Sequence, residues 1–260
     1  MIEKNFIFLA GHHRSGTSLL HEIMKEHPLI SGFSDTGVIE DEGQLLQTVY
    51  EPAKTYGGPG KYIFNDAAYM NESHPLSTTA SAERLLAQWE RHYDTERPFY
   101  IEKSPPNLIK TRFQKSLFPK SRIVVNFSQT VDVGYATQKW SRTSIKRLVE
   151  HTLRGYEIFA DDRSSLQKVY ALRYEDFVAH PQREIDKVWS FLEMESQPIR
   201  HDVRANVNDK YFAMWEKNRS GLINRLRFRV DEALEARANR FGYSLNDCRQ
   251  LQLSTFFGNA

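Results

Sequence analysis

Cysteine is almost absent from this chain, which holds a single one, Cys248, among its 260 residues. One cysteine cannot build an intramolecular disulfide framework, and it speaks against a cysteine-based metal site. This usage fits a reducing compartment. Long apolar runs are absent too, since the run at residues 6–10 is too short for a signal peptide or a membrane span. We therefore expect a soluble, cytoplasmic protein without a membrane partner.

A strong excess of charge of one sign is also missing. Lysine and arginine number 35 against 33 aspartates and glutamates, so the formal net charge is +2. No long basic run precedes a helix-turn-helix or a similar DNA-reading motif, so we expect no nucleic-acid partner. The length suits one large domain with a sizeable core, and no internal repeat interrupts it. The sequence thus predicts a single domain over residues 1–260.

Apolar segments alternate with helical patterns along the chain. Residues 6–10 form a continuous apolar run, typical of a buried parallel strand, and Gly11 ends it. A helix is expected from about residue 15 to residue 27, before Pro28. Further strands are expected at residues 99–102, 123–125 and 169–172, with helices near 85–93, 105–117, 131 onward, 144–161, 181–192 and 230–241. This alternation predicts an α/β fold with a doubly wound parallel sheet flanked by helices, whose ligand lies at the carboxyl ends of the strands.

Residues 31–79 show no clear periodicity. Three glycines and a proline at residues 57–60 mark a turn, and small polar residues are frequent throughout the stretch. A segment this long without a regular pattern is unusual in a compact domain, and is more often a lid or a binding loop than a simple connection. We expect this segment to lie on the acceptor side of a binding site.

The turn after the first strand reads Gly11-His12-His13-Arg14-Ser15-Gly16-Thr17-Ser18. Its G-x-x-x-x-G spacing is that of a phosphate-binding loop, and backbone N–H groups at the start of the following helix favour an anion there. Nucleoside triphosphatases place a lysine where this chain has Thr17, whereas Arg14 offers a fork of donors suited to phosphate or sulfate. The two histidines lack sequence partners at metal-ligand spacing, so contacts to the loop or to an acceptor are the favoured interpretation.

Four segments of the chain resemble the sulfotransferases that use PAPS (3′-phosphoadenosine 5′-phosphosulfate). The likeness covers about residues 5–192 and extends more thinly to Tyr243. It implies an enzyme that transfers a sulfuryl group from PAPS to a hydroxyl or an amine, with a small molecule as the acceptor. The segments are residues 14–20, similar to the R-S-G-T-[TS]-L-L signature; 102–108, similar to an E-K-S-P-P-N-L stretch of bacterial members; 174–181, similar to Y-E-D-L…HP; and 35–44, which look like one bacterial subgroup.

The resemblance also implies roles for individual residues. Arg14 and Lys103 are expected to stabilise the oxygen that leaves sulfur. A base is expected among the acidic residues that follow the first helix, which are Asp35, Glu40 and Glu42. Donor contacts are expected from the phosphate loop and from the positions that match the family's nucleoside and C-terminal basic segments: His13, Arg14, Ser15, Gly16, Thr17, Ser18, Ser128, Tyr174 and Arg219. The resemblance implies PAPS as the co-substrate. Because a transferring SO₃ group carries less charge than a phosphoryl group, we expect no metal ion.

One segment departs from the family pattern. The donor's 3′-phosphate is normally held by an arginine and by a serine eight residues later, and here these positions hold Ser128 and Ala136. Losing a charge-assisted contact costs about 1.5–3 kcal/mol, or roughly ten- to a hundredfold in affinity. Three interpretations stay open: other cations hold the phosphate (Lys139, Arg142 or the basic stretch Lys217–Arg229), the donor lacks a 3′-phosphate, or the protein is a catalytically degenerate nucleotide-binding homologue.

A P-loop kinase or nucleotidase is the alternative enzyme class. Thr17 in place of lysine argues against it. So does the lack of an aspartate at a strand end that would bind magnesium. Magnesium-dependent turnover of ATP would favour it.

Overall fold

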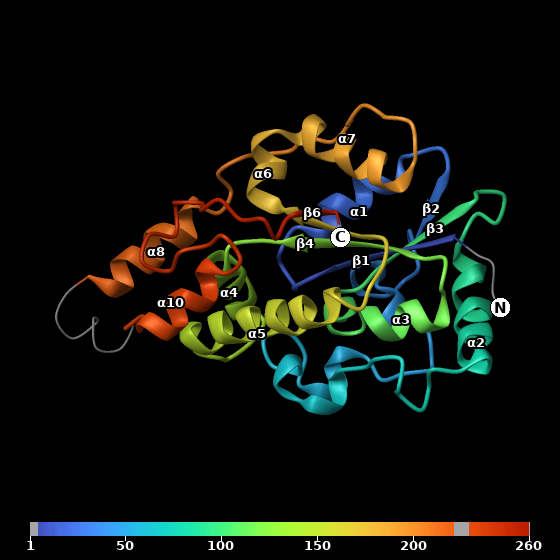
Figure 1. The fold of residues 1–260 in the computed structure, drawn as a ribbon, viewed down its shortest axis with the longest axis horizontal. Coiled ribbons are helices and arrows are strands. Elements are labelled where there is room, and N and C mark those ends of the chain that lie inside the picture. The colour runs from blue at the N-terminus through green and yellow to red at the C-terminus, as the bar shows by residue number, and fades with distance from the viewer. Residues whose placement is uncertain (1–4, 221–228, 260) are drawn as a thin grey trace.

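The sheet at the centre of the molecule has six strands in the order β2-β3-β1-β4-β5-β6 (Figure 1). The computed structural model describes residues 5–220 and 229–259. The strands are β1 (Asn5–Gly11), β2 (Ile30–Gly32), β3 (Phe99–Lys103), β4 (Arg122–Phe127), β5 (Val169–Arg173) and β6 (Gly258–Asn259). The predicted α/β fold with a doubly wound sheet is confirmed. The sheet is not wholly parallel, however, because β6 pairs antiparallel with β5, and a strand of two residues is too short to leave a sequence pattern.

Strand β1 is buried on both faces, which explains its unbroken apolar sequence. Phe6, Phe8 and Ala10 join the core on one side of the sheet, while Ile7 and Leu9 join the core on the other. In the sheet, β1 lies between β3 and β4, so the strand order runs outward from it in both directions. The carboxyl end of β1 is therefore at the switch point of the topology, where ligands of such sheets bind.

Helices cover both faces of the sheet (Figure 1). On one face lie α1 (Thr17–Lys25), α6 (Tyr174–Ala179) and α7 (Pro181–Leu192). On the other lie α2 (Thr79–Trp89), α3 (Thr111–Leu117), α4 (Thr130–Gln138) and α5 (Ile145–Arg163), while α8 (Asp209–Arg219) and α10 (Glu232–Asn239) gather at one end of the molecule. Among the helices of the described residues, none is both long and apolar enough to cross a bilayer.

The chain between β2 and α2 is built from short 3₁₀ helices. They are η1 (Ile39–Asp41), η2 (Gly43–Leu45), η3 (Ala53–Tyr56), η4 (Tyr62–Phe64) and η5 (Asp66–Ala68). Phe33 and Tyr62 are fully buried, so the segment packs firmly on the body of the molecule. Strand β2, which comes directly before this segment, is not predicted by the sequence. It has three residues at the edge of the sheet and a single large apolar side chain, too few to give a strand pattern. The segment carries Glu40 and Glu42 toward the carboxyl end of β1.

Three helical elements differ from the sequence-based expectation. The helix predicted over residues 105–117 divides at Lys110, whose φ is −132°, into η7 (Pro105–Ile109) and α3. Two consecutive prolines at the start of η7 lack the N–H groups of regular helical bonding. The sequence pattern does not predict α6, which has six residues, or α8, whose buried residues are only Tyr211 and Trp215.

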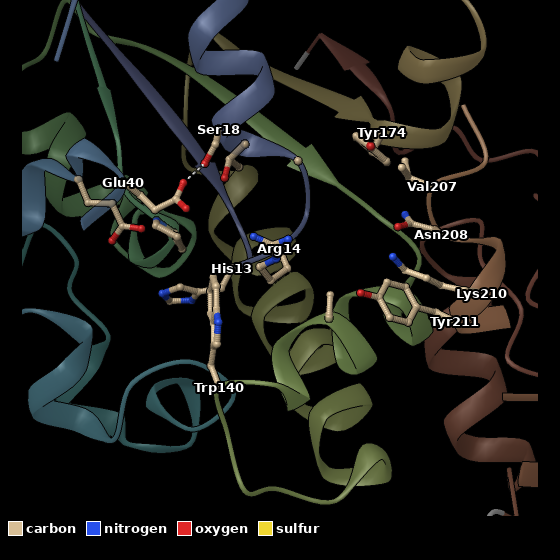
Figure 2. A pocket seen from close by; sticks show the side chains of 15 residues that line it. His13, Arg14, Ser18, Glu40, Trp140, Tyr174, Val207, Asn208, Lys210 and Tyr211 are labelled. Atoms are coloured by element: carbon tan, nitrogen blue, oxygen red, sulfur yellow. Dashed lines mark hydrogen bonds between the residues drawn. The ribbon is translucent and has the colours of Figure 1, made fainter. Parts of the chain in front are cut away.

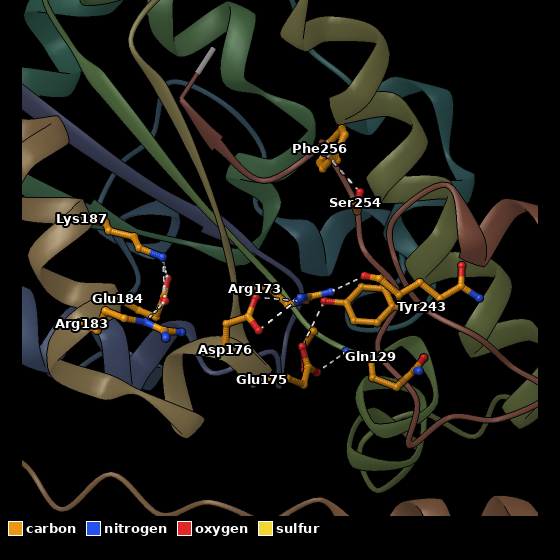
Figure 3. A network of polar contacts seen from close by, with 12 residues as sticks. Gln129, Arg173, Glu175, Asp176, Arg183, Glu184, Lys187, Tyr243, Ser254 and Phe256 are labelled. Carbon is orange, nitrogen blue, oxygen red and sulfur yellow. Dashed lines mark hydrogen bonds and ion pairs between the residues drawn. The ribbon is translucent and has the colours of Figure 1, made fainter.

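The C-terminal segment returns to the sheet and lies beside β5 (Figure 3). Arg173, the last residue of β5, donates hydrogen bonds to Asp176 at 2.7 Å and to the backbone oxygen of Gln252 at 3.0 Å. Arg163 of α5 donates to the backbone oxygens of Phe256 and, at 3.1 Å, of Gly258. Two arginines from the body of the fold thus hold the final residues against the edge of the sheet.

Candidate active site

The loop between β1 and α1 is a rigid anion cradle. Ser15 donates to the backbone oxygen of His12 through its N–H (3.2 Å) and its hydroxyl (2.8 Å), and Asn126 donates to the backbone oxygen of Ser15 at 2.6 Å. Gly16 is the N-cap of α1 with φ of 90°, and no side chain caps the first N–H groups of the helix. These donors and the positive end of the helix dipole are available to an anion.

Glycine is required at position 16 both by its positive φ and by the close approach of another side chain. A Cβ there would lie 2.5 Å from the ring of Tyr174, so the first turn of α6 packs directly on the loop. This contact brings Tyr174 to the site, as the sequence predicts. It also joins the two ends of the pocket that opens above the loop.

A pocket of about 280 Å³ lies over the cradle (Figure 2). Glu40 marks one end, Arg14 and His13 lie in the middle, and Tyr174, Lys210 and Tyr211 mark the other end. The pocket therefore has an acidic end and a nucleoside-sized end with aromatic and basic side chains. Its lining residues are His13, Arg14, Gly16, Thr17, Ser18, Glu40, Glu42, Pro105, Ala136, Trp140, Tyr174, Val207, Asn208, Lys210 and Tyr211.

Lys103 at the end of β3 is the buried cation of the site, with 1% of its surface exposed. Its ammonium donates to the backbone oxygen of Glu40 at 2.6 Å and to the hydroxyl of Ser18 at 3.5 Å. The Glu40 carboxylate lies 4.0 Å from the same ammonium and accepts a 2.7 Å hydrogen bond from Ser18. Lysine, serine and glutamate thus form one network at the mouth of the cradle.

Glu42 is the buried acid of the site, with 7% of its surface exposed. Burial raises the pKa of its carboxyl to about 7, although Lys103 and a hydrogen bond from Gln44 oppose this rise. A carboxyl with a pKa near the working pH is suited to take a proton from a substrate and release it again. Glu42 therefore has the properties of a general base.

Arg14 and His13 occupy the middle of the pocket. The guanidinium of Arg14 lies 5.0 Å from the ring centre of Trp140, which is 55% exposed. Burial lowers the pKa of His13 to about 3, so its imidazole is neutral at physiological pH. His12 points away from the pocket, with Nε2 at 2.9 Å from the backbone oxygen of Thr152. Within the described part of the chain, no three histidine, cysteine, aspartate or glutamate side chains gather as a metal site would need.

Two lysines face the ring of Tyr211 at the nucleoside-sized end. The ammonium of Lys139, which ends α4, lies 5.8 Å from the ring centre, and that of Lys210 lies 5.1 Å from it. Ala136 lines the same end of the pocket. Positive charge is thus present near Ala136, the position at which the family has the serine that holds the 3′-phosphate.

Ser128 is buried rather than facing this pocket. Its hydroxyl lies 3.3 Å from a carboxylate oxygen of Asp132 and 3.1 Å from one of Glu175, which also accepts from the hydroxyl of Tyr243 at 3.2 Å (Figure 3). Burial raises the pKa of both carboxyls, and the charge of Glu175 raises that of Asp132 further. A contact between Ser128 and the PAPS molecule was expected. In the structure the hydroxyl of Ser128 instead donates to the carboxyl groups of Asp132 and Glu175.

Four other predicted site residues are not among those that line the pocket. Ser15 and Lys103 are buried just behind the lining, and Lys103 contacts the lining residues Ser18 and Glu40. Asp35 and Arg219 lie away from it. Asp35 is exposed on the turn before η1 and does not line the pocket. Arg219, at the end of α8, donates to the backbone oxygens of Leu245 and Asn246. Its guanidinium is thereby used to fix the segment that follows α10. The remainder of the predicted basic stretch, at residues 221–228, lies outside the described residues.

Some lining residues are not predicted by the sequence. Trp140, Asn208 and Lys210 belong to segments that carry no motif, and they meet the loop only because α4 ends and α8 begins beside it. Among these three residues, only Trp140 could be suspected of a binding role from the sequence, because a tryptophan that follows two polar residues is unusual for the core. Lys139, by contrast, is among the cations that the sequence suggests.

Comparison with known proteins identifies the family and the fold of this chain. The sequence profile of the sulfotransferase family matches residues 6–198. No curated protein matches the sequence. The fold is similar to that of the sulfotransferase domain from the curacin biosynthetic pathway, with a TM-score of 0.57 and 16% identity over 94% of this chain and 99% of that one.

Two further solved structures show the same fold. The sulfotransferase domain of the Synechococcus PCC 7002 olefin synthase has a TM-score of 0.51 and 16% identity, covering 88% of this chain and 94% of that one. Sulfotransferase STF9 from Mycobacterium avium has a TM-score of 0.52 and 12% identity, covering 93% of this chain and 76% of that one. Since the family profile spans most of the chain, from β1 to beyond α7, this protein belongs to the sulfotransferase family.

Proposed function

We propose that this sulfotransferase transfers the sulfuryl group of PAPS to a hydroxyl or an amine of a small-molecule acceptor. The observation that carries the proposal is the uncapped start of α1, with Arg14 and the buried Lys103 beside it and Glu42 in the same pocket. Family membership supports sulfuryl transfer. The contents of the pocket support the donor, the base and the direction of the reaction.

The phosphosulfate of the donor fits the loop by charge and by available donors. The first N–H groups of α1 have no side-chain cap, and the helix dipole favours an anion at this point. Arg14 and Lys103 add two positive charges on either side. Thr17 takes the place of the lysine that would reach the outer phosphates of a nucleoside triphosphate. These features support a phosphosulfate over ATP.

At the other end of the pocket, we expect Tyr174 to contact the adenine. Lys139 and Lys210, which lie by the ring of Tyr211, are then the cations closest to the expected position of the 3′-phosphate. They would replace the arginine and serine that this chain lacks. Arg219 is less suited because its guanidinium already binds backbone oxygens.

In the proposed reaction, the Glu42 carboxylate takes the proton from the acceptor O–H or N–H as the acceptor atom attacks sulfur. The bond between sulfur and the bridging oxygen of the 5′-phosphate breaks, and PAP leaves with the electron pair on that oxygen. Arg14 and Lys103 stabilise this developing charge. The protonated Glu42 then releases its proton to solvent, which a pKa of about 7 allows.

The acceptor is expected to approach from the acidic end of the pocket. Glu42 lines that end, and the exposed ring of Trp140 offers an apolar surface at its rim.

Calorimetric titration of the purified protein with PAP, adenosine 5′-phosphosulfate and ATP, each without and with magnesium, tests the proposal. We expect micromolar binding of PAP without metal and weaker binding of the other two. A preference for adenosine 5′-phosphosulfate would instead indicate a donor without the 3′-phosphate. Binding of ATP only in the presence of magnesium would contradict the proposal and favour a kinase. Tight binding of PAP with no transfer from PAPS to any acceptor in a panel of alcohols, phenols and amines would favour a catalytically degenerate homologue.

A further inference from the structure

Glu40 occupies the part of the cradle that a sulfonate would need. Its carboxylate accepts the hydrogen bond of the Ser18 hydroxyl at 2.7 Å, on the first turn of α1. It also lies 4.0 Å from the ammonium of Lys103, the buried cation of the site. A carboxylate and a sulfonate use the same kind of contacts, since both present anionic oxygens to a hydroxyl and an ammonium.

The two anions cannot both accept from Ser18. Its hydroxyl has one proton, and that proton is donated to Glu40. Of the three protons on Lys103, one is donated to the backbone oxygen of Glu40 at 2.6 Å and one to the hydroxyl of Ser18 at 3.5 Å. A sulfonate placed at the same point would also be repelled by the carboxylate charge. Glu40 must therefore move before a sulfonate can take these contacts.

The backbone around Glu40 holds this arrangement under strain. Glu40 has φ of 55° and ψ of 20°, and Asp41 has φ of 48°, so two successive residues adopt the left-handed region. Side chains other than glycine adopt this region only at a cost in free energy. Asp41 offsets this cost by accepting two hydrogen bonds from Thr36, at 2.9 Å through its N–H and at 2.5 Å through its hydroxyl. The loop thus directs the side chain of Glu40 into the site.

The side chain itself can leave without disturbing the core. It is 40% exposed, and its neighbour Ile39 is 77% exposed. The residues that fix the loop are Thr36 and Asp41, which do not depend on the Glu40 carboxylate. A rotation of the Glu40 side chain into solvent therefore breaks only its contacts with Ser18 and Lys103.

We propose that Glu40 is a specificity-determining residue, whose carboxylate takes the place of the donor's sulfonate when that subsite is empty. This inference rests on the proposed function for the identity of the donor. PAPS must displace the carboxylate, whereas PAP, which lacks the sulfonate, binds with Glu40 still in contact with Ser18 and Lys103. Glu40 thus narrows the difference in affinity between the sulfated donor and its desulfated product.

The Glu40→Gln variant tests this inference, because glutamine keeps the size and can still accept from Ser18 but carries no charge. We expect the affinity for PAPS to rise about fivefold to tenfold, equivalent to ~1–1.4 kcal/mol, and the affinity for PAP to change less than twofold. Asp66→Asn is the matched control, since it removes one negative charge from an exposed position in the same segment, outside the pocket. Equal changes for PAPS and PAP, or no change for either, would overturn the inference.

Titration of the same variants with inorganic sulfate separates this inference from the proposed donor. Glu40→Gln is expected to bind sulfate more tightly than the wild type and Asp66→Asn, whatever the nucleotide specificity proves to be. If neither PAP nor PAPS binds the wild type but sulfate responds in this way, the proposed donor fails and the role of Glu40 stands. If sulfate affinity is the same in all three proteins, the role of Glu40 fails. Thermal unfolding of each variant confirms that it is folded before titration.

Discussion

Two glutamates separated by one residue have opposite surroundings in this site. Glu40 is partly exposed and bound to Ser18 and near Lys103, so it is a charged partner of the cradle. Glu42 is buried, and its carboxyl is largely protonated below neutral pH because burial disfavours the charge. The backbone turn between them, with its left-handed residues, produces this division of environment.

The position of Glu42 leads to a prediction about pH. A base must be deprotonated to act, and its pKa is raised to about 7, so transfer from PAPS should rise with pH through about 7 and level off above it. Glu42→Gln should lose at least about a hundredfold in kcat and lose this pH step. Initial rates between pH 5.5 and 9 measure both.

Binding of PAP to the same variant is the control, since Glu42 lies at the acceptor end of the pocket. Unchanged PAP affinity with a lost pH step assigns the step to Glu42. A variant that keeps the wild-type pH profile would show that another group takes the proton.

At the scale of residues, the sequence predicts the cradle better than the base. Arg14 and Lys103 follow directly from their motifs, because each comes at the end of a strand whose position is clear from its apolar run. The choice among Asp35, Glu40 and Glu42 depends on the path of a loop with several left-handed residues, which no local pattern encodes. Trp140 and Lys210 reach the pocket through tertiary packing alone.

At the scale of elements, α4 and α8 form the nucleoside-sized end of the pocket. Their contact is aromatic, since the rings of Tyr135 and Tyr211 are parallel within 5° at 6.2 Å. Asn218 donates to the hydroxyl of Tyr135 at 2.6 Å and supports the same contact. This packing brings Lys139 of α4 and Lys210 of α8 to one ring.

We expect these two lysines to bind the 3′-phosphate of the donor. Lys210→Ala and Lys139→Ala should each weaken PAP binding by roughly tenfold, because each removes a charge-assisted contact. Adenosine 5′-phosphosulfate has no 3′-phosphate, so its affinity should change little. Calorimetry with both nucleotides makes the comparison within one protein.

Lys54→Ala, which removes an exposed charge from η3, controls for a general loss of positive potential. A loss of affinity for both nucleotides in the Lys210 and Lys139 variants would show that these lysines act through long-range charge or through folding. If neither variant loses affinity for PAP, the cations that bind the 3′-phosphate must be sought among residues 217–229.

Short elements explain most of what the sequence pattern misses at this scale. The strand–loop–helix around the cradle is long and periodic enough to be predicted. The 3₁₀ helices η1 to η5 and the helix α6 are each too short to show a period, and α8 lacks an apolar stripe because most of its surface is exposed.

At the scale of the whole molecule, three neutral histidines meet at the cradle: His12 and His151 lie behind it, and His13 lies between them and the pocket that it lines. His12 and His151 have ring centres 5.4 Å apart, and burial lowers the pKa of His12 to about 4, of His13 to about 3 and of His151 well below its usual value. In the unfolded chain each takes up a proton near pH 6.5. Their burial therefore favours the folded state fully above pH 6.5, and this contribution is lost as the pH falls toward 4.

We predict that the His12→Gln variant gains free energy of unfolding relative to the wild type as the pH falls from 7 to 5. The gain should reach about 2 kcal/mol at pH 5, since one pKa unit corresponds to ~1.4 kcal/mol and His12 has a pKa of about 4 in the folded protein. Glu42 acts in the opposite sense, because its raised pKa favours the folded state at low pH and this is lost as the pH rises through about 7. The comparison with His12→Gln cancels that effect.

Urea denaturation followed by tryptophan fluorescence at pH 7, 6 and 5 gives the required free energies. An identical pH dependence in wild type and variant would show that His12 takes up its proton in the folded state. The alternation of strands and helices that predicts the sheet contains no information on this cluster, because the three side chains meet only after α5 packs behind the loop.

The pairing of β6 with β5 has a consequence for the behaviour of the protein at high concentration. β5 is the last of the parallel strands, and without β6 its free N–H and C=O groups would be open to a strand from another molecule. Arg163 and Arg173 keep the covering residues in place. The C-terminal residues therefore cover the edge of the sheet, and their detachment would expose β5 as a template for aggregation.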